Sequence, residues 1–230
     1  MTESPRQLTL DWPHQPSFAA EDFLPAPSNR EALAAIGQWP QWASRLLLLV
    51  GPEGAGKSHL AALWAAKSHA TTLWAGRLEE SDVQTCAGSP ATLIEDADRV
   101  GEGEDCLFHI VNAAVQTQGW LLLTARTPAD AWSLKTPDLL SRLRLAPLVR
   151  LGAPDIELTE AVLFKLFSDR QLLVEPKVVA FIALRIERSL AAAREIVAAL
   201  DEEALSRGRR VTRAMAAELL RVTPPADDTP

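Results

Sequence analysis

A short segment of the chain has the residue types and the spacing of a phosphate-binding loop. Residues 51–58 read Gly-Pro-Glu-Gly-Ala-Gly-Lys-Ser and fit the pattern G-x-x-x-x-G-K-[ST]. Small residues let backbone N–H groups wrap a phosphate, and a helix that opens at Lys57 points the positive end of its dipole at that anion. The pattern predicts that this chain binds a nucleotide. The competing interpretation is a glycine-containing turn with an ordinary surface lysine.

The residues of this loop have separate expected roles. Lys57 would reach the β and γ phosphates, and Ser58 would place its hydroxyl on Mg²⁺. Mg²⁺ keeps several waters and otherwise binds phosphate oxygens and a nearby carboxylate. The predicted nucleotide-binding residues here are Pro52, Glu53, Gly54, Ala55, Gly56, Lys57, Ser58 and His59.

An apolar run that ends in two acids supplies the expected carboxylate. Residues 91–96 read Ala-Thr-Leu-Ile-Glu-Asp and follow the loop by about 40 positions, where nucleotidases of this topology place the Mg²⁺ carboxylate. Of Glu95 and Asp96, one would hold Mg²⁺ through water and the other would polarise an attacking water. With Ser58 they form the predicted metal site, and they are the predicted catalytic acids. Two solvated acids at a strand end are the alternative.

Three more residues complete the predicted constellation. Thr124 ends the apolar run 120–123, at the edge of the sheet where ligands bind, and could sense the γ-phosphate. Arg142 and Arg194 could spread guanidinium groups over phosphates, the first from a neighbouring subunit and the second from a lid. Viewed singly, a strand-end threonine is common and each arginine would be an ordinary surface residue.

The elements that must position these residues alternate along the chain. Strands are predicted at 45–50, 71–75, 91–95, 120–124 and 147–151. Helices are predicted between them at about 57–69, 77–86, 103–117 and 136–144, after a first helix that Ser28 caps and Pro40 ends. This alternation indicates an α/β fold with a parallel sheet covered on both faces.

The strands cease after residues 152–154, Gly-Ala-Pro, and only helices follow. They are predicted at 155–170, 176–186, 189–206 and 212–221, with Ser189 and Thr212 as caps. We therefore expect an extended leader (1–27), a nucleotide-binding core (28–153), a helical lid (154–222) and a disordered tail (223–230).

Composition restricts the class of protein. Of the 230 residues, 47% are apolar, which is ample for a buried core, and the formal net charge of −7 argues against a broad nucleic-acid-binding surface. No apolar run approaches the ~20 residues that a membrane span needs, so no membrane association is expected. Two cysteines, with no secretory signal before the fold, favour a reducing cytoplasm.

These features together resemble the AAA+ ATPases, and the closer match is to the DnaA branch. Ser141-Arg142-Leu143, followed by the run 148–151, is similar to that branch's arginine-finger segment, and residues 194–200 (Arg-Glu-Ile-Val-Ala-Ala-Leu) are similar to its sensor-2 helix. The resemblance covers roughly residues 18–221. It implies an AAA+ P-loop NTPase core with a parallel sheet, followed by a small all-helical lid. A full initiator would continue with a helix-turn-helix domain, for which the residues after Val222 leave no room.

The leader carries a second motif. Residues 7–12, Gln-Leu-Thr-Leu-Asp-Trp, resemble the short motif with which bacterial proteins dock on the replicative sliding clamp. An extended segment would insert Leu8, Leu10 and Trp12 into an apolar groove while the Gln7 amide fixes the register. The alternative is that the segment packs back on its own domain.

A clamp motif before a shortened DnaA-like ATPase resembles the Hda family. That resemblance implies a protein that binds ADP or ATP with Mg²⁺, docks on the clamp and promotes hydrolysis of DnaA-bound ATP, with Arg142 acting in trans. The DnaA pattern has Asp-Asp where this chain has Glu95-Asp96, and Thr-Ser-Asp where it has Thr124-Ala125-Arg126. We therefore expect weak ATP hydrolysis by the chain alone. Homo-oligomers, a recruiter or loader of replication proteins, and a free-standing ATPase remain alternatives.

Overall fold

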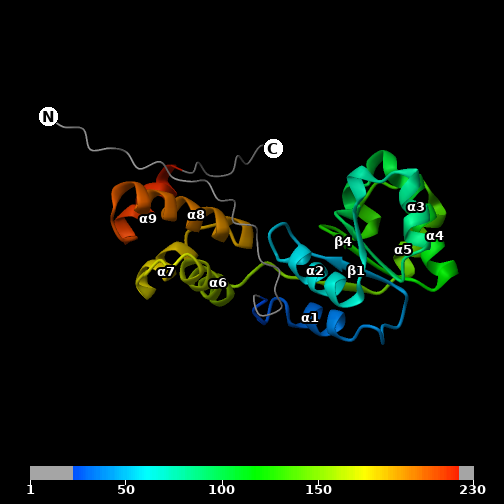
Figure 1. Cartoon of the computed structure of the whole chain (residues 1–230), viewed down its shortest axis with the longest axis horizontal. Coiled ribbons are helices and arrows are strands. Elements are labelled where there is room, and N and C mark those ends of the chain that lie inside the picture. Colours follow the sequence, from blue (N-terminus) through cyan, green and yellow to red (C-terminus); the bar gives the residue numbers. More distant parts are fainter. Residues whose placement is uncertain (1–22, 223–230) are drawn as a thin grey trace.

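The computed structural model describes residues 23–222, which form a parallel sheet with covering helices and a separate group of helices (Figure 1). The sheet has the strand order β2-β3-β4-β1-β5, and every neighbouring pair is parallel. Its strands are β1 (Leu46–Val50), β2 (Thr71–Trp74), β3 (Ala91–Glu95), β4 (Trp120–Ala125) and β5 (Leu148–Arg150).

The central strands are runs of apolar residues because both of their faces are covered. All residues of β1 and β3 are buried. On one face they pack against α3 (Glu80–Ala87), α4 (Glu104–Thr117) and α5 (Pro137–Leu145). On the other face they pack against α1 (Arg30–Gly37) and α2 (Lys57–Ser68).

The register of the strands places the predicted site residues at one edge of the sheet. Val50 of β1 pairs with Ala125 of β4, and Ile94 of β3 pairs with Leu123 of β4. Because parallel strands end at the same edge, the loop after β1 and the acids at the end of β3 lie beside Thr124.

The lid contains α6 (Ile156–Asp169), α7 (Pro176–Ala183), α8 (Leu190–Arg207) and α9 (Arg213–Val222), gathered at one end of the molecule (Figure 1). These helices share their own apolar core, which includes Phe167, Ile182 and Leu200. The Asp155 carboxylate caps α6 by accepting from the Leu158 N–H at 2.7 Å. The predicted caps Ser189 and Thr212 also accept backbone N–H groups, of Ala191 and Met215 respectively.

Two predicted helix starts were wrong. The first helix is preceded by Asn29, whose side chain accepts from the Ala26 N–H at 2.8 Å and donates to the Leu24 carbonyl, while the Ser28 hydroxyl has no partner among the described residues. The helix predicted from residue 77 begins at Glu80, because a short 3₁₀ turn over Ala75–Arg77 follows β2 directly. The predicted α/β arrangement, a parallel sheet followed by a group of helices, is otherwise confirmed.

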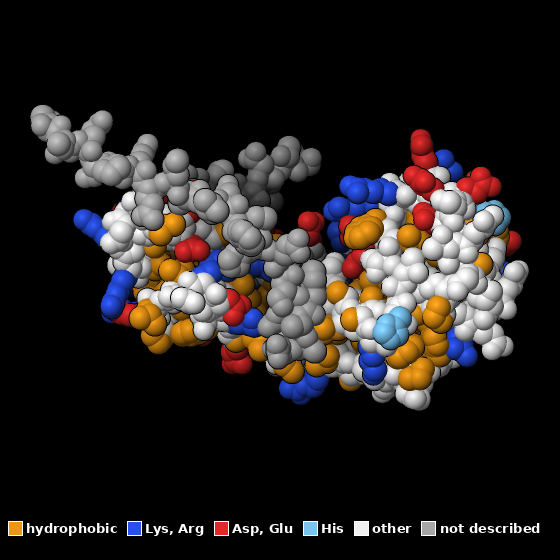
Figure 2. All heavy atoms as spheres, in the orientation of Figure 1, with side chains coloured by type: hydrophobic (Ala, Val, Ile, Leu, Met, Phe, Trp, Pro, Cys, Tyr) orange, Lys and Arg blue, Asp and Glu red, His pale blue; other side chains and the backbone are white. Residues whose placement is uncertain are grey.

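The surface carries charges of both signs. On the face shown in Figure 2, Lys and Arg side chains lie among Asp and Glu side chains on both the core and the lid. Within residues 23–222, no helix combines the length and the apolar character required to cross a bilayer.

Loss of the Ser189 cap should destabilise the lid. Its hydroxyl oxygen accepts from the N–H groups of Ala191 and Ala192, at 3.1 and 3.4 Å, so Ser189→Ala should lower the unfolding free energy by about 1 kcal/mol. Urea unfolding followed by far-UV circular dichroism would measure the change. Ser206→Ala, at an exposed position of the same helix, is the control, and equal effects of the two substitutions would argue against the cap.

Candidate nucleotide-binding site

The loop between β1 and α2 has a backbone that only glycine adopts readily. Gly54 and Gly56 have φ values of 70° and 102°, and Gly56 directly precedes the first residue of α2. A Cβ at Gly54 would also collide with the Ser189 hydroxyl of the lid. The loop therefore presents backbone N–H groups at a helix start, as an anion cradle requires.

Lys57 lies inside the curve of this loop. Its side chain is buried, and its Nζ donates to the carbonyls of Gly51 and Pro52 at 2.8 and 2.9 Å. Burial lowers the pKa of the Lys57 ammonium, and nearby carboxylates, led by Asp96 and Asp98, oppose that shift. A phosphate at the loop would add negative charge beside an ammonium that has lost much of its hydration.

Three predicted residues from three elements meet at the Glu95 carboxylate. Its Oε2 accepts from the Ser58 hydroxyl at 3.2 Å and from the buried Thr124 hydroxyl in a short hydrogen bond. Thr124 in turn accepts from the Asp96 N–H at 3.1 Å. Burial raises the pKa of the Glu95 carboxyl, while the bonds from Thr124 and Ser58 oppose the shift. The Thr124 hydroxyl thus positions the two acids, and its contact with a γ-phosphate stays a prediction.

The donor set suits a hard divalent cation. The Ser58 hydroxyl and the Glu95 carboxylate are oxygen donors 3.2 Å apart, close enough to share one coordination sphere. Among residues 23–222, no group of three or more His, Cys, Asp or Glu side chains could hold a metal by itself. A cation here would need phosphate oxygens and waters for its remaining ligands, which is the way that Mg²⁺ binds. The Ser58 and Glu95 oxygens therefore fit a magnesium site, whereas the participation of Asp96 stays a prediction.

Two arginines near the acids were missed by the sequence analysis. Arg99 lies 3.8 Å from both the Glu53 and the Asp96 carboxylates and so connects the loop to the strand end. Arg126 donates its Nε to Asp98 at 2.7 Å, and its backbone N–H donates to the same carboxylate. Asp98 is therefore the partner of Arg126. The only sign of Arg126 in the sequence was that an arginine stands where the DnaA pattern Thr-Ser-Asp has its aspartate.

The lid contacts the loop through the start of α8. The Leu190 N–H donates to the Gly54 carbonyl at 2.8 Å. Arg194 follows Leu190 by four residues, about 6 Å along the helix. Arg194 is exposed, but the protein around it lowers the pKa of the guanidinium by desolvation. A guanidinium remains charged nevertheless. The lid thus brings a cation within one helical turn of the loop.

Apolar side chains surround Gly56 on the side toward the lid. A Cβ at that position would lie 3.4 Å from Leu190, 3.9 Å from Leu151 and 4.0 Å from Phe23. The Phe23 ring also meets the His59 ring edge-on, with centroids 5.4 Å apart. Such a surface beside a phosphate loop suits a flat base. Phe23 was missed because it stands in a proline-rich stretch without periodicity.

No family model matches the chain. The chain is 26% identical over 210 residues to the chromosomal replication initiator protein DnaA of Cutibacterium acnes. The alignment covers 80% of this chain and 41% of that protein, so the chain spans less than half the length of its curated relative. This chain is a homologue of DnaA.

Solved structures agree on the fold. Domain III of DnaA from Thermotoga maritima superposes with a TM-score of 0.77 at 20% identity, over 91% of this chain and 98% of that domain. A DnaA bound to AMPPCP and single-stranded DNA gives a TM-score of 0.68 at 15% identity, over 84% of this chain and 68% of that one. The Thermotoga maritima RuvB branch-migration motor gives a TM-score of 0.69 at 16% identity, over 90% of this chain and 72% of that one. The DnaA-like fold is therefore an AAA+ fold.

The predicted DnaA-type arginine finger, Arg142, makes no hydrogen bond or ion pair with the residues of the loop or with the acids. Arg142 is exposed on α5, and no hydrogen bond or ion pair joins its side chain to any residue within 23–222. Arg144, two residues later, is paired with Asp130 at 2.6 Å. Near Arg142 in the sequence, Leu145 and Leu148 are 85% and 36% exposed, which is unusual for leucine. The predicted clamp-binding residues Gln7, Leu8, Leu10 and Trp12 lie outside the described residues.

The raised pKa of Glu95 predicts a pH-dependent stability cost. As pH rises past the ordinary value of 4.5, the unfolded chain loses this proton before the folded chain does, so the folded state loses stability until its own pKa is passed. Glu95→Gln should therefore gain stability relative to wild type between pH 4 and neutral pH, by about 1.4 kcal/mol per unit of pKa shift.

Urea unfolding at several pH values would measure this difference. Glu102→Gln removes one exposed carboxylate shortly after the same strand and is the matched control for charge. A difference between Glu95→Gln and wild type that stays constant with pH, or that falls as pH rises, would contradict the assignment.

Proposed function

We propose that this chain is a nucleotide-bound regulator of chromosome replication initiation that docks on the sliding clamp and promotes hydrolysis of ATP held by DnaA. Homology to a chromosomal replication initiator supports a role in initiation. The observation that carries the regulatory part is Arg142, a guanidinium that is exposed and unpaired among the described residues. An arginine that serves a site in another molecule must be free of partners in its own.

The nucleotide part of the proposal rests on the loop and the acids. The loop would bind the phosphates through its N–H groups and Lys57, and Ser58 with Glu95 would hold Mg²⁺. When bound, Mg²⁺ neutralises charge on the phosphates. Arg194 would approach the phosphates from the lid, and ADP and ATP both fit this scheme.

Weak hydrolysis by the chain itself follows from the environment of Glu95. A general base must hold its charge and keep an oxygen free for water. Burial raises the pKa of Glu95, and one of its oxygens already accepts from both Ser58 and Thr124. The nucleotide would then serve as a ligand that orders the core and lid.

In trans, the Arg142 guanidinium would lie beside the γ-phosphate bound to DnaA. There it would stabilise the negative charge that develops on the phosphoryl oxygens in the transition state. The exposed side chains of Leu145 and Leu148 would supply apolar contact area to the same partner. The same surface could also meet a second copy of this chain.

Clamp docking would be carried by the leader. Gln7, Leu8, Leu10 and Trp12 precede Phe23 by at most 16 residues, and Phe23 contacts the surroundings of the phosphate loop. A leader bound to the clamp would therefore connect directly to the nucleotide site.

A DnaA-like recruiter or loader is the alternative. Arg209 and Arg210 are exposed near the end of α8 and could contact nucleic acid locally. The net charge of −7 and the mixed charges in Figure 2 speak against a broad DNA surface. A free-standing ATPase would require substantial turnover that depends on Glu95 and Asp96.

Clamp binding should depend on Gln7 and Leu8. We expect purified full-length protein to bind the sliding clamp, and the Gln7→Ala, Leu8→Ala double variant to lose at least about tenfold in affinity because register and an apolar contact are both removed. Thr9→Ala, between the motif residues, is the control. Surface plasmon resonance on immobilised clamp would measure all three, and a wild-type protein that does not bind would favour the recruiter or ATPase alternatives.

Stimulated hydrolysis should depend on Arg142. With clamp and ATP-bound DnaA present, Arg142→Ala should lower the stimulated rate by about a thousandfold or to the basal level, since an arginine finger contributes roughly that much. Arg144→Ala, on the same helix, should retain most of the stimulation. Single-turnover release of phosphate would report the rate, and nucleotide affinity of each variant would show that its own site is intact. Equal stimulation by wild type and Arg142→Ala would rule out this role.

A further inference from the structure

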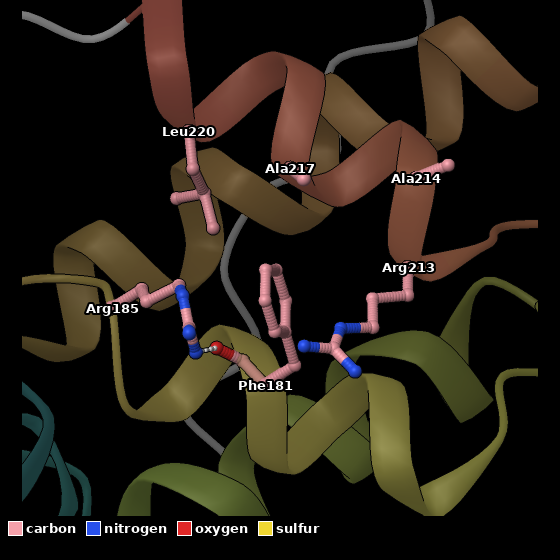
Figure 3. Close-up of a pocket in the computed structure, with 6 residues that line it drawn as sticks. All are labelled: Phe181, Arg185, Arg213, Ala214, Ala217 and Leu220. Carbon is pink, nitrogen blue, oxygen red and sulfur yellow. Dashed lines mark hydrogen bonds between the residues drawn. The ribbon is translucent and has the colours of Figure 1, made fainter.

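The lid contains a cavity that the nucleotide site does not use. It has a volume of about 720 Å³ and lies between α7 and α9 (Figure 3). Six residues line it: Phe181, Arg185, Arg213, Ala214, Ala217 and Leu220. This volume is typical of sites that hold a small ligand or a short peptide segment.

Two positive charges flank an aromatic ring in this cavity. The guanidinium carbons of Arg185 and Arg213 lie 3.9 and 4.7 Å from the centroid of the Phe181 ring. Arg185 follows α7, the helix that carries Phe181, and Arg213 is the first residue of α9 (Figure 3). Arg185 also donates to the Phe181 carbonyl at 3.1 Å. Cation–π contacts hold the guanidiniums in place but leave most of their N–H donors open.

No carboxylate neutralises these two arginines within the described residues. Glu218, the acid of α9, and Glu203 of α8 both pair with Arg207 instead. The cavity therefore combines two unpaired cations with an apolar floor of Ala217 and Leu220. Its chemistry fits a segment that carries carboxylates close to apolar groups.

We propose that this cavity binds the chain's own segment that follows α9, residues 223–230. That segment reads Thr-Pro-Pro-Ala-Asp-Asp-Thr-Pro, so its two acids come directly after apolar residues and it has no basic residue. Asp227 and Asp228 would pair with Arg185 and Arg213. Pro224 and Pro225 would lie against Phe181 and Leu220, as proline segments pack on aromatic-lined grooves.

The segment can reach both arginines. From Arg213 to Val222, α9 rises about 13.5 Å over the nine steps between its ten residues. An extended run of five residues from Val222 to Asp227 covers about 16 Å, so a chain that turns back along α9 brings its carboxylates to the start of that helix. The covalent connection also raises the effective concentration of the segment to the millimolar range, which favours it over an outside peptide of the same chemistry.

Such docking would tie α7 to α9 across the lid core. Both helices contribute to the apolar core shared with α8, and α8 begins at the phosphate loop. Release of the segment would loosen the edge of the lid formed by α9.

Arginine side-chain NMR of the full chain would test this inference. Asp227→Asn, Asp228→Asn should shift the Nε–Hε signals of Arg185 and Arg213, whereas Thr229→Ala in the same segment should leave them unchanged. Arg207, paired within the described residues, provides an internal reference. Unchanged signals of Arg185 and Arg213 in the double aspartate variant would overturn the proposal and leave the cavity to an outside acidic ligand.

Amide hydrogen exchange supplies a second readout. The double aspartate variant should speed exchange along α9 by about two- to fivefold, since exposed ion pairs contribute at most about 1 kcal/mol. Arg185→Gln should speed it similarly, and combining the variants should add little because they remove one interaction. Fully additive effects would contradict a direct pairing. Neither readout involves nucleotide, clamp or DnaA, so its outcome is independent of the proposed function.

Discussion

The close approach of the phosphate loop to α8 is the constraint on which the site depends. Gly54 makes this contact through its backbone, because its carbonyl accepts from the Leu190 N–H. A Cβ at Gly54 would collide with Ser189. A positive φ at Gly54 and a capped start of α8 are both needed for this arrangement. The sheet fixes one side of the contact and the lid fixes the other. A conformational change in the sheet or in the lid would therefore alter the conformation of the phosphate loop.

The site buries one basic and one acidic side chain, Lys57 and Glu95. Burial lowers the pKa of Lys57 and raises the pKa of Glu95, so the protein environment disfavours the charged form of both. A polyphosphate beside Lys57 and a cation beside Glu95 would restore the missing favourable interactions. In the function that we propose, nucleotide binding and folding would be coupled through these two residues, because a ligand that stabilises their charges also stabilises the folded state.

The positively charged side chains discussed above lie in three different parts of the molecule. Lys57 and Arg194 belong to the loop and the helix that touches it, whereas Arg142 stands exposed and unpaired among the described residues beside exposed leucines. Arg185 and Arg213 face a cavity in the lid. This separation suits a protein that holds a nucleotide in one place while it presents charge to other partners elsewhere, in keeping with the function that we propose.

The sequence alone determined the loop, the acid-ended strand and the alternation of strands and helices, because glycine spacing, apolar runs and helix caps act locally. It identified Glu95, Ser58 and Thr124 separately, but the tertiary structure decided that they share hydrogen bonds, since strand register brings together residues that are far apart in the chain. Arg99 and Arg126 were missed because their contacts with Glu53 and Asp98 join residues that are distant in sequence. The contact of Phe23 with His59 is equally distant, and Phe23 also stands in a stretch without periodicity. Arg185 follows Phe181 by four residues, but only packing between α7 and α9 could place Arg213 on the same ring, because that long-range contact leaves no periodic trace in the sequence.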